Sequence, residues 1–141
     1  MRPIAIVVAC LALLALTGCT AFQPVALKRE QDGLHISICQ SFAGDQLIVK
    51  TTDSHDNVAT IWRAEGAFDV EKKAEYVFGI PPTGMTNVVG PNSDALSRPY
   101  IDVFFRNGGV DGQVAGHFVL KDVRTDDWLH SDGSRTPTPC K

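Results

Sequence analysis

The side chains that could act as nucleophiles, acids or bases are scattered along this chain rather than grouped in known catalytic spacings. Ser54-His55-Asp56 contains the residue types of a serine hydrolase. Consecutive residues cannot adopt the geometry of a catalytic triad, because its members converge from different parts of a fold. The sequence has no Gly-x-Ser-x-Gly nucleophile elbow. We therefore interpret residues 54–56 as a polar turn and expect no catalytic residues.

Metal-ligating residue types are present, but their spacing does not indicate a metal site. No pair of histidines has the short spacing typical of metal ligands. His35 and His117 fall in expected strands and could converge across a sheet, and a solvated surface position is the alternative that we favour. The acidic residues lack the regular spacing of a calcium loop. We expect neither a metal nor a cofactor. The residues considered are His35, His55, His117, His130, Asp53, Asp56, Asn57, Asp122, Asp126 and Asp127.

Aromatic side chains give the main candidate for a ligand surface. Trp62 lies within an expected strand, where a lone tryptophan usually belongs to the core. Trp128 lies near the end of the chain, and we expect it to pack over the open end of the domain. Aromatic faces can stack on sugars and cations. If an exposed aromatic patch exists, its candidate members are Trp128, Tyr100 and Phe104.

The elements that position these side chains follow an N-terminal leader. Met1-Arg2-Pro3 gives a short positive start, and residues 4–16 form an almost unbroken apolar run. A charged start, an apolar centre and small residues at the end are the parts of a secretory signal peptide. The run is shorter than the about 20 residues that a membrane span needs. We interpret residues 1–18 as a signal peptide.

Leu16-Thr17-Gly18-Cys19 directly follows the apolar run and resembles the lipobox of bacterial lipoproteins. The resemblance implies cleavage before Cys19 and a diacylglycerol on its sulfur, and two acyl chains anchor a protein stably. Residues 19–24 would then be a lipidated tether, which holds a domain at 25–141 within about 20 Å of the membrane. The expected location is the extracytoplasmic face of the cell membrane, or the outer membrane in a Gram-negative cell. A plain secretory signal or an uncleaved anchor is the alternative.

Two cysteines remain once Cys10 leaves with the leader and Cys19 carries the lipid. Cys39 and Cys140 are an even pair in an oxidising compartment, so we predict a disulfide bond between them. The bond would close a loop of about 100 residues, worth roughly 4 to 5 kcal/mol in the chain-entropy account. Two free buried thiols are the alternative.

The mature chain reads as short strands separated by turns. Asp32-Gly33 between two alternating segments predicts a hairpin, and Pro81-Pro82 cannot continue a central strand because proline lacks a ladder donor. Residues 66–75 favour a surface hairpin, and residues 125–129 favour one helical turn. The expected strands span residues 25–30, 34–39, 45–52, 58–64, 75–80, 86–89, 100–106 and 114–121.

About eight short strands without an amphipathic helix predict one all-β domain, and we favour an immunoglobulin-like antiparallel β-sandwich over a small barrel. The positions of Trp62 and Cys140 relative to Cys39 do not match the signature of true immunoglobulin domains. The region 39–140 is similar to small actinobacterial lipoproteins of unknown function, through Ile-Trp-Arg-Ala at 61–64 and Asp-Trp-Leu-His-Ser-Asp-Gly at 127–133. This resemblance implies no activity.

The net charge and the motifs limit the possible classes of function. The net charge of −3 argues against nucleic acid, whose phosphates need a basic surface. We expect a membrane-anchored, non-enzymatic domain that binds an envelope protein or glycan, or that serves as a structural subunit. A small cell-envelope hydrolase is the alternative, and a deep pocket holding two or more acids would favour it.

Replacing Cys19 with alanine tests the lipid anchor. Without the thiol no thioether to a diacylglycerol can form, so Cys19→Ala should leave the membrane fraction or retain its leader. Membrane fractionation and intact mass measure these outcomes. Unchanged fractionation together with an unchanged mass would contradict the lipobox assignment.

Overall fold

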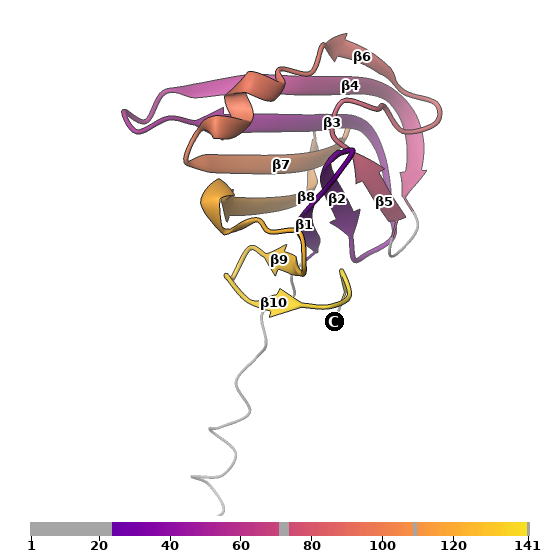
Figure 1. Cartoon of the computed structure of the whole chain (residues 1–141). Coiled ribbons are helices and arrows are strands. Elements are labelled where there is room, and N and C mark those ends of the chain that lie inside the picture. The colour runs from indigo at the N-terminus through magenta and orange to yellow at the C-terminus, as the bar shows by residue number, and fades with distance from the viewer. Residues whose placement is uncertain (1–23, 71–73, 109, 141) are drawn as a thin grey trace, which may run out of the picture.

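The computed structural model describes residues 24–70, 74–108 and 110–140. The predicted signal peptide and Cys19 lie outside these residues. Two five-stranded antiparallel sheets pack together as a β-sandwich, which confirms the all-β prediction (Figure 1). Within the described part of the chain, no helix has the length and apolar character needed to cross a membrane.

The first sheet has the strand order β10-β9-β1-β2-β5, and the second has the order β6-β4-β3-β7-β8. The strands of the first sheet are β1 (Val25–Glu30), β2 (Gly33–Ile38), β5 (Ala74–Val77), β9 (Trp128–His130) and β10 (Arg135–Thr136). Those of the second are β3 (Phe42–Thr52), β4 (Val58–Val70), β6 (Thr86–Val89), β7 (Tyr100–Asn107) and β8 (Val110–Val119). Two short 3₁₀ turns, η1 (Ser93–Ser97) and η2 (Leu120–Asp122), precede β7 and follow β8.

The predicted hairpin at Asp32-Gly33 is confirmed. Glu30 pairs with Gly33, so the connection between β1 and β2 is a two-residue turn. Gly33 has a φ of 142°, a conformation that glycine adopts without the steric penalty of a side chain. Leu34, Ile36 and Ile38 then point into the core, where each is at most 2% exposed.

The core lies between the facing sides of the two sheets. Ile101, Val103 and Phe105 of β7 point inward, as their alternation predicts. Trp62 is fully buried, which confirms its predicted core position. Its indole Nε1–H donates to the side-chain oxygen of Asn87 at 2.8 Å. That bond satisfies a buried donor and ties β4 to β6.

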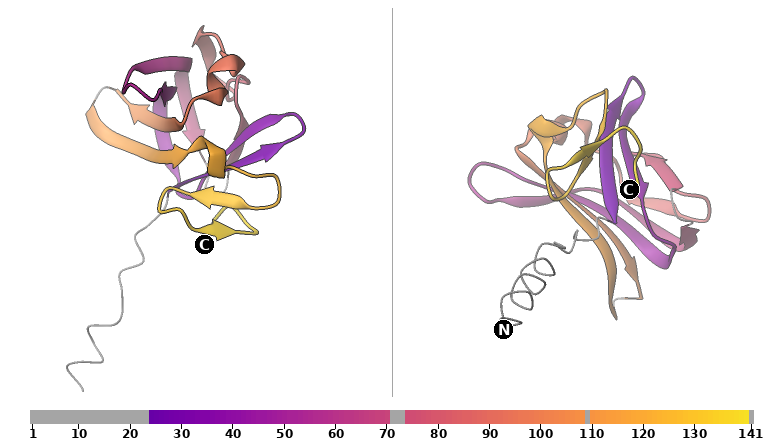
Figure 2. Two further views of the ribbon diagram at one scale, coloured as in Figure 1. Left: turned by 60° about the vertical axis from the view of Figure 1, so that its left-hand side comes forward. Right: turned by 90° about the horizontal axis from the view of Figure 1, so that it is seen from below.

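Two local predictions were wrong. Residues 66–75 do not form a hairpin, because β4 continues along β3 to Val70 while β5 pairs with β2 in the other sheet. Residues 125–129 do not form a helical turn. Leu129 instead pairs with Leu27 of β1, and the short helical turn lies earlier, at η2. Figure 2 shows this C-terminal segment beside β1 from a second direction.

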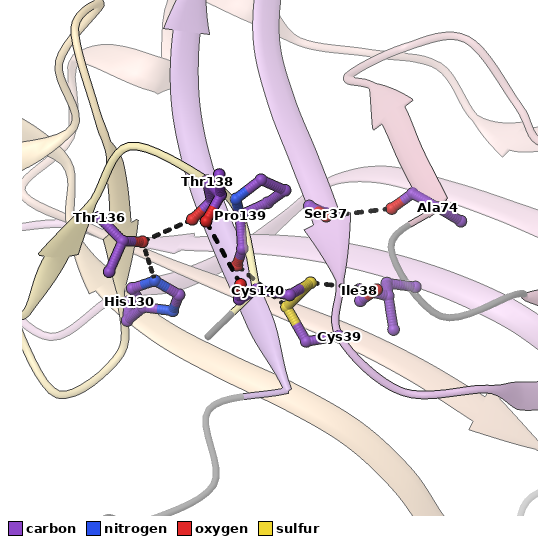
Figure 3. The surroundings of a disulfide bond; sticks show 9 residues. All are labelled: Ser37, Ile38, Cys39, Ala74, His130, Thr136, Thr138, Pro139 and Cys140. Atoms are coloured by element: carbon purple, nitrogen blue, oxygen red, sulfur yellow. Dashed lines mark hydrogen bonds between the residues drawn. A yellow bond between two sulfur atoms is a disulfide. The ribbon is translucent and has the colours of Figure 1, made fainter.

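The predicted Cys39–Cys140 disulfide is confirmed, with a Cα–Cα distance of 5.3 Å (Figure 3). Cys39 follows β2, and its backbone N–H donates to the carbonyl of Pro24 at 2.7 Å. The bond therefore holds the C-terminal tail where β1 begins. Within the tail, a 2.7 Å hydrogen bond joins His130 Nε2 and Thr136 Oγ1.

Removing both sulfurs tests how much this link stabilises the domain. Cys39→Ser combined with Cys140→Ser should lower the free energy of unfolding by about 2–5 kcal/mol, because the open unfolded chain gains entropy. Urea unfolding followed by tryptophan fluorescence measures the loss, and chemically reduced wild-type protein is the matched control. Equal unfolding midpoints for the oxidised wild type and the double variant would contradict the prediction.

Candidate functional site

The three predicted aromatic residues do not form one exposed patch. Trp128 is only 5% exposed and lies in β9 of the first sheet, consistent with packing at the end of the sandwich. Tyr100 and Phe104 lie in β7 of the second sheet. Tyr100 is 38% exposed and stacks on His117, whereas Phe104 is half-buried beneath the cations of Lys50 and Arg106. Trp128 therefore cannot belong to an exposed aromatic patch, because its side chain is buried.

His35, in β2, is held between two carboxylates next to the edge strand β5 of the first sheet. Its Nε2 lies 2.7 Å from Asp32 Oδ1, and its Nδ1 hydrogen-bonds to Glu75 of β5. Partial burial lowers the pKa of His35, but the hydrogen bonds and charges of the two carboxylates outweigh it and raise the pKa above 6.5. The hydrogen bond with His35 in turn lowers the pKa of Asp32. This cluster links the β1–β2 turn to β5.

His117 belongs to a separate ion pair on the second sheet. Its Nδ1 lies 2.6 Å from Asp102 Oδ1, and its ring stacks on Tyr100. His35 and His117 therefore lie in different sheets and do not converge on one site. Across the described residues, no group of three or more His, Cys, Asp or Glu side chains is arranged to hold a metal ion.

The Ser54-His55-Asp56 segment is a turn, as predicted. The carboxylate of Asp53 accepts hydrogen bonds from the side chain and backbone N–H of Asn57 and from the backbone N–H of His55. The Asn57 side chain first, and then these backbone donors, lower the pKa of Asp53 to about 2. The Asp53 carboxylate thus closes the loop between β3 and β4.

A groove lies where β1, β7, β8 and the two 3₁₀ turns meet. Its volume is about 470 Å³, within the range of ordinary small-molecule sites. Three cationic side chains line it, and no carboxylate lies among its described lining residues. Its apolar lining comes from η1, η2 and the adjoining strand ends. The cations are Arg29, Arg98 and Lys121, and the other lining residues are Leu96, Ser97, Pro99, Tyr100, Val119 and Leu120.

Most cations elsewhere in the described structure already have a partner. Lys28, Arg63 and Arg135 each form an ion pair, and Lys50 and Arg106 lie over the ring of Phe104. Among the described residues, the cations without an ion pair or ring contact are Arg29, Arg98, Lys121 and Arg124. Three of these four line the groove, so its positive charge is uncompensated within the described structure.

Backbone hydrogen bonds hold the walls of the groove together. The N–H of Arg29 donates to the carbonyl of Arg124 at 2.8 Å, and the N–H of Leu120 donates to the carbonyl of Pro99 at 2.9 Å. Arg98 Nη1 donates to the buried hydroxyl of Thr51 at 3.4 Å, which orients the guanidinium without neutralising it. Segments far apart in the sequence thus converge on one site.

Sequence reasoning missed this groove. Arg29, Arg98 and Lys121 show no common spacing, and each is separated from the others by at least one strand. The sequence gives no signal for the site, because Asp94 stands four residues before Arg98 and only the folded structure shows that the two form no ion pair. Tyr100, singled out for another reason, does line the groove.

Comparisons of this chain with models of protein families, with curated proteins and with solved structures found no match.

The carboxylates around His35 make part of the stability depend on pH. Since folding raises the pKa of His35, its stabilising contribution is complete below the unfolded value near 6.5 and is lost as pH rises through the folded value. Charged neighbours are Asp32 in the turn, Glu75 on β5 and Lys28 opposite on β1.

His35→Gln should therefore destabilise the protein more at about pH 5.5 than at about pH 8.5. Urea unfolding at both pH values measures the two losses, and His55→Gln in the exposed turn is the matched control. A loss that is equal at the two pH values, or larger at the higher one, would overturn this assignment.

Proposed function

We propose that this protein is a membrane-anchored extracytoplasmic lipoprotein whose β-sandwich is a non-enzymatic binding domain, and that the groove lined by Arg29, Arg98 and Lys121 is its ligand site. The observation that carries the proposal is the gathering of three uncompensated cations around one cavity in a chain of net charge −3. Such cations attract and orient an anionic group.

The composition of the groove favours binding over catalysis. General acid–base catalysis needs an acid or base within hydrogen-bond reach of the substrate. The described lining residues include no Asp, Glu, His or Cys. The histidine–carboxylate clusters involve His35 and His117, neither of which lines the groove. A hydrolase at this site would have only Lys121 and Tyr100 to move protons.

The leader supports the anchored location. Residues 1–18 have the three parts of a signal peptide, and Cys19 stands at the lipobox position. The Cys39–Cys140 bond fits the same location, because disulfides persist in oxidising compartments outside the cytoplasm.

The strand order supports an immunoglobulin-like connectivity. The order β8-β7-β3-β4-β6 corresponds to the G-F-C-C′-C″ sheet of variable-type immunoglobulin domains, and β1-β2-β5 corresponds to strands A, B and E. The chain differs in that β5 precedes β6, whereas C″ precedes E in those domains. We place the fold in this broad class as part of the proposal.

The groove lies away from the point where the predicted tether joins the domain. The tether joins at β1, whose first residue, Val25, lies against Gly116 of β8. Arg29 is four residues further along β1, about 13 Å at the usual rise of a strand. Val119 lies three residues beyond Gly116 on β8, and it lines the groove together with Arg29. In the anchored protein, the groove would therefore lie on the order of 13 Å from the point where the tether joins the domain.

Site-specific crosslinking in intact cells tests the binding function. A photoreactive phenylalanine analogue at Tyr100, which lines the groove and is 38% exposed, should form a defined adduct in the anchored protein. The same analogue at Val58, which is 61% exposed in the β3–β4 hairpin, is the control.

The Tyr100 adduct should disappear when Arg29→Gln and Arg98→Gln are combined, since both changes remove the charge that holds the ligand. Mass spectrometry of the crosslinked protein measures the adduct. Absence of a Tyr100-specific adduct, or an adduct that persists in the double variant, would contradict binding at this groove.

A further inference from the structure

The groove has two chemically different sides. Arg29, Arg98 and Lys121 supply positive charge, while Leu96, Pro99 and Val119 supply apolar surface. Leu120 also lines the groove but is 2% exposed and belongs to the core, so the apolar surface open to a ligand comes from the other three. A ligand that satisfied both sides would itself combine a charged part with an apolar part.

The cationic side is suited to an oxyanion. A guanidinium donates several N–H groups in a planar fork that matches a carboxylate or a phosphate. Arg98 uses one nitrogen on the hydroxyl of Thr51, which restricts its side chain and leaves other donors for a ligand. No carboxylate of the described residues pairs with any of the three cations. A neutral ligand would leave this charge uncompensated.

The apolar side is suited to a hydrocarbon body. Leu96 packs against the core cluster but remains half-buried, and Pro99 and Val119 are likewise half-buried. Covering these side chains removes apolar surface from water, and the gain increases with the area covered. A bare inorganic anion would leave these apolar side chains exposed to water.

We infer that the ligand of this groove is an anionic amphiphile, a molecule with one phosphate or carboxylate head and an apolar chain. The inference rests on the proposed function of the groove and adds the chemical class of what it binds. The head contacts Arg98, Arg29 and Lys121, and the chain lies along the apolar wall formed by Leu96, Pro99 and Val119.

Calorimetric titration of the mature chain carrying Cys19→Ala, which has no acyl chains of its own, tests the ligand class. The probes are decyl phosphate, decanoate, the neutral decyl maltoside, hexyl phosphate and inorganic phosphate, each below its micelle concentration. Both anionic decyl compounds should bind at one site. Decyl maltoside, hexyl phosphate and inorganic phosphate should each bind at least about 10-fold more weakly, because each lacks the charge or most of the apolar area.

Arg98→Gln should weaken decyl phosphate binding about 10-fold, the effect of losing one charge-assisted contact of about 1.4 kcal/mol. Arg29→Gln is the second variant, because it avoids the buried Thr51 contact. Arg124→Gln is the matched control: it removes the same charge next to the groove, but Arg124 does not line it. Thermal unfolding shows that each variant is folded.

Several results would overturn this ligand class. They are equal binding of decyl maltoside and decyl phosphate, equal binding of inorganic and decyl phosphate, no binding of either anionic decyl compound, and equal weakening by Arg124→Gln and Arg98→Gln. Each of them leaves the crosslinking experiment at Tyr100 to decide separately whether the groove binds a ligand in the cell.

Discussion

The bond between Cys39 and Cys140 holds the C-terminal segment against the strand from which the first sheet extends. Because Cys39 is also hydrogen-bonded to Pro24, the bond fixes the tail beside the start of β1. Pairing of β9 with β1 buries Leu129 and Trp128. The same segment brings the Arg124 carbonyl to the N–H of Arg29. Arg29, whose side chain lines the groove, is thus tied through its backbone to the same C-terminal segment.

Much of this fold could be predicted from local patterns. The bounds of β1 and β6 match the expected segments, since strand alternation and turn residues act over a few positions. The inward face of β7 followed from its alternation, and the disulfide followed from counting cysteines. The lipid anchor and the envelope location remain predictions, because Cys19 lies outside the described residues.

Features that depend on distant partners could not be predicted. β9 and β10 span three and two residues, too few to show a period, and they form because β1 offers an edge. Ser37 lies on the face of β2 opposite to Ile36 and is still fully buried. Its hydroxyl donates to the carbonyl of Ala74. Lys28 and Arg135 have acidic partners nearby whereas Arg98 has none among the described residues, and only the folded arrangement shows that difference.

The edge strands of the two sheets affect whether copies of the protein associate. Among the described strands, the edge strands β5, β6 and β10 have four, four and two residues, and each therefore offers few main-chain donors and acceptors to another chain. The fourth edge strand, β8, is longer, and its Gly116 packs against Val25 of β1 in the other sheet. Short edges resist strand-to-strand association. If the proposed anchor concentrates copies in the plane of a bilayer, short edges would keep them separate without repulsion from a high net charge.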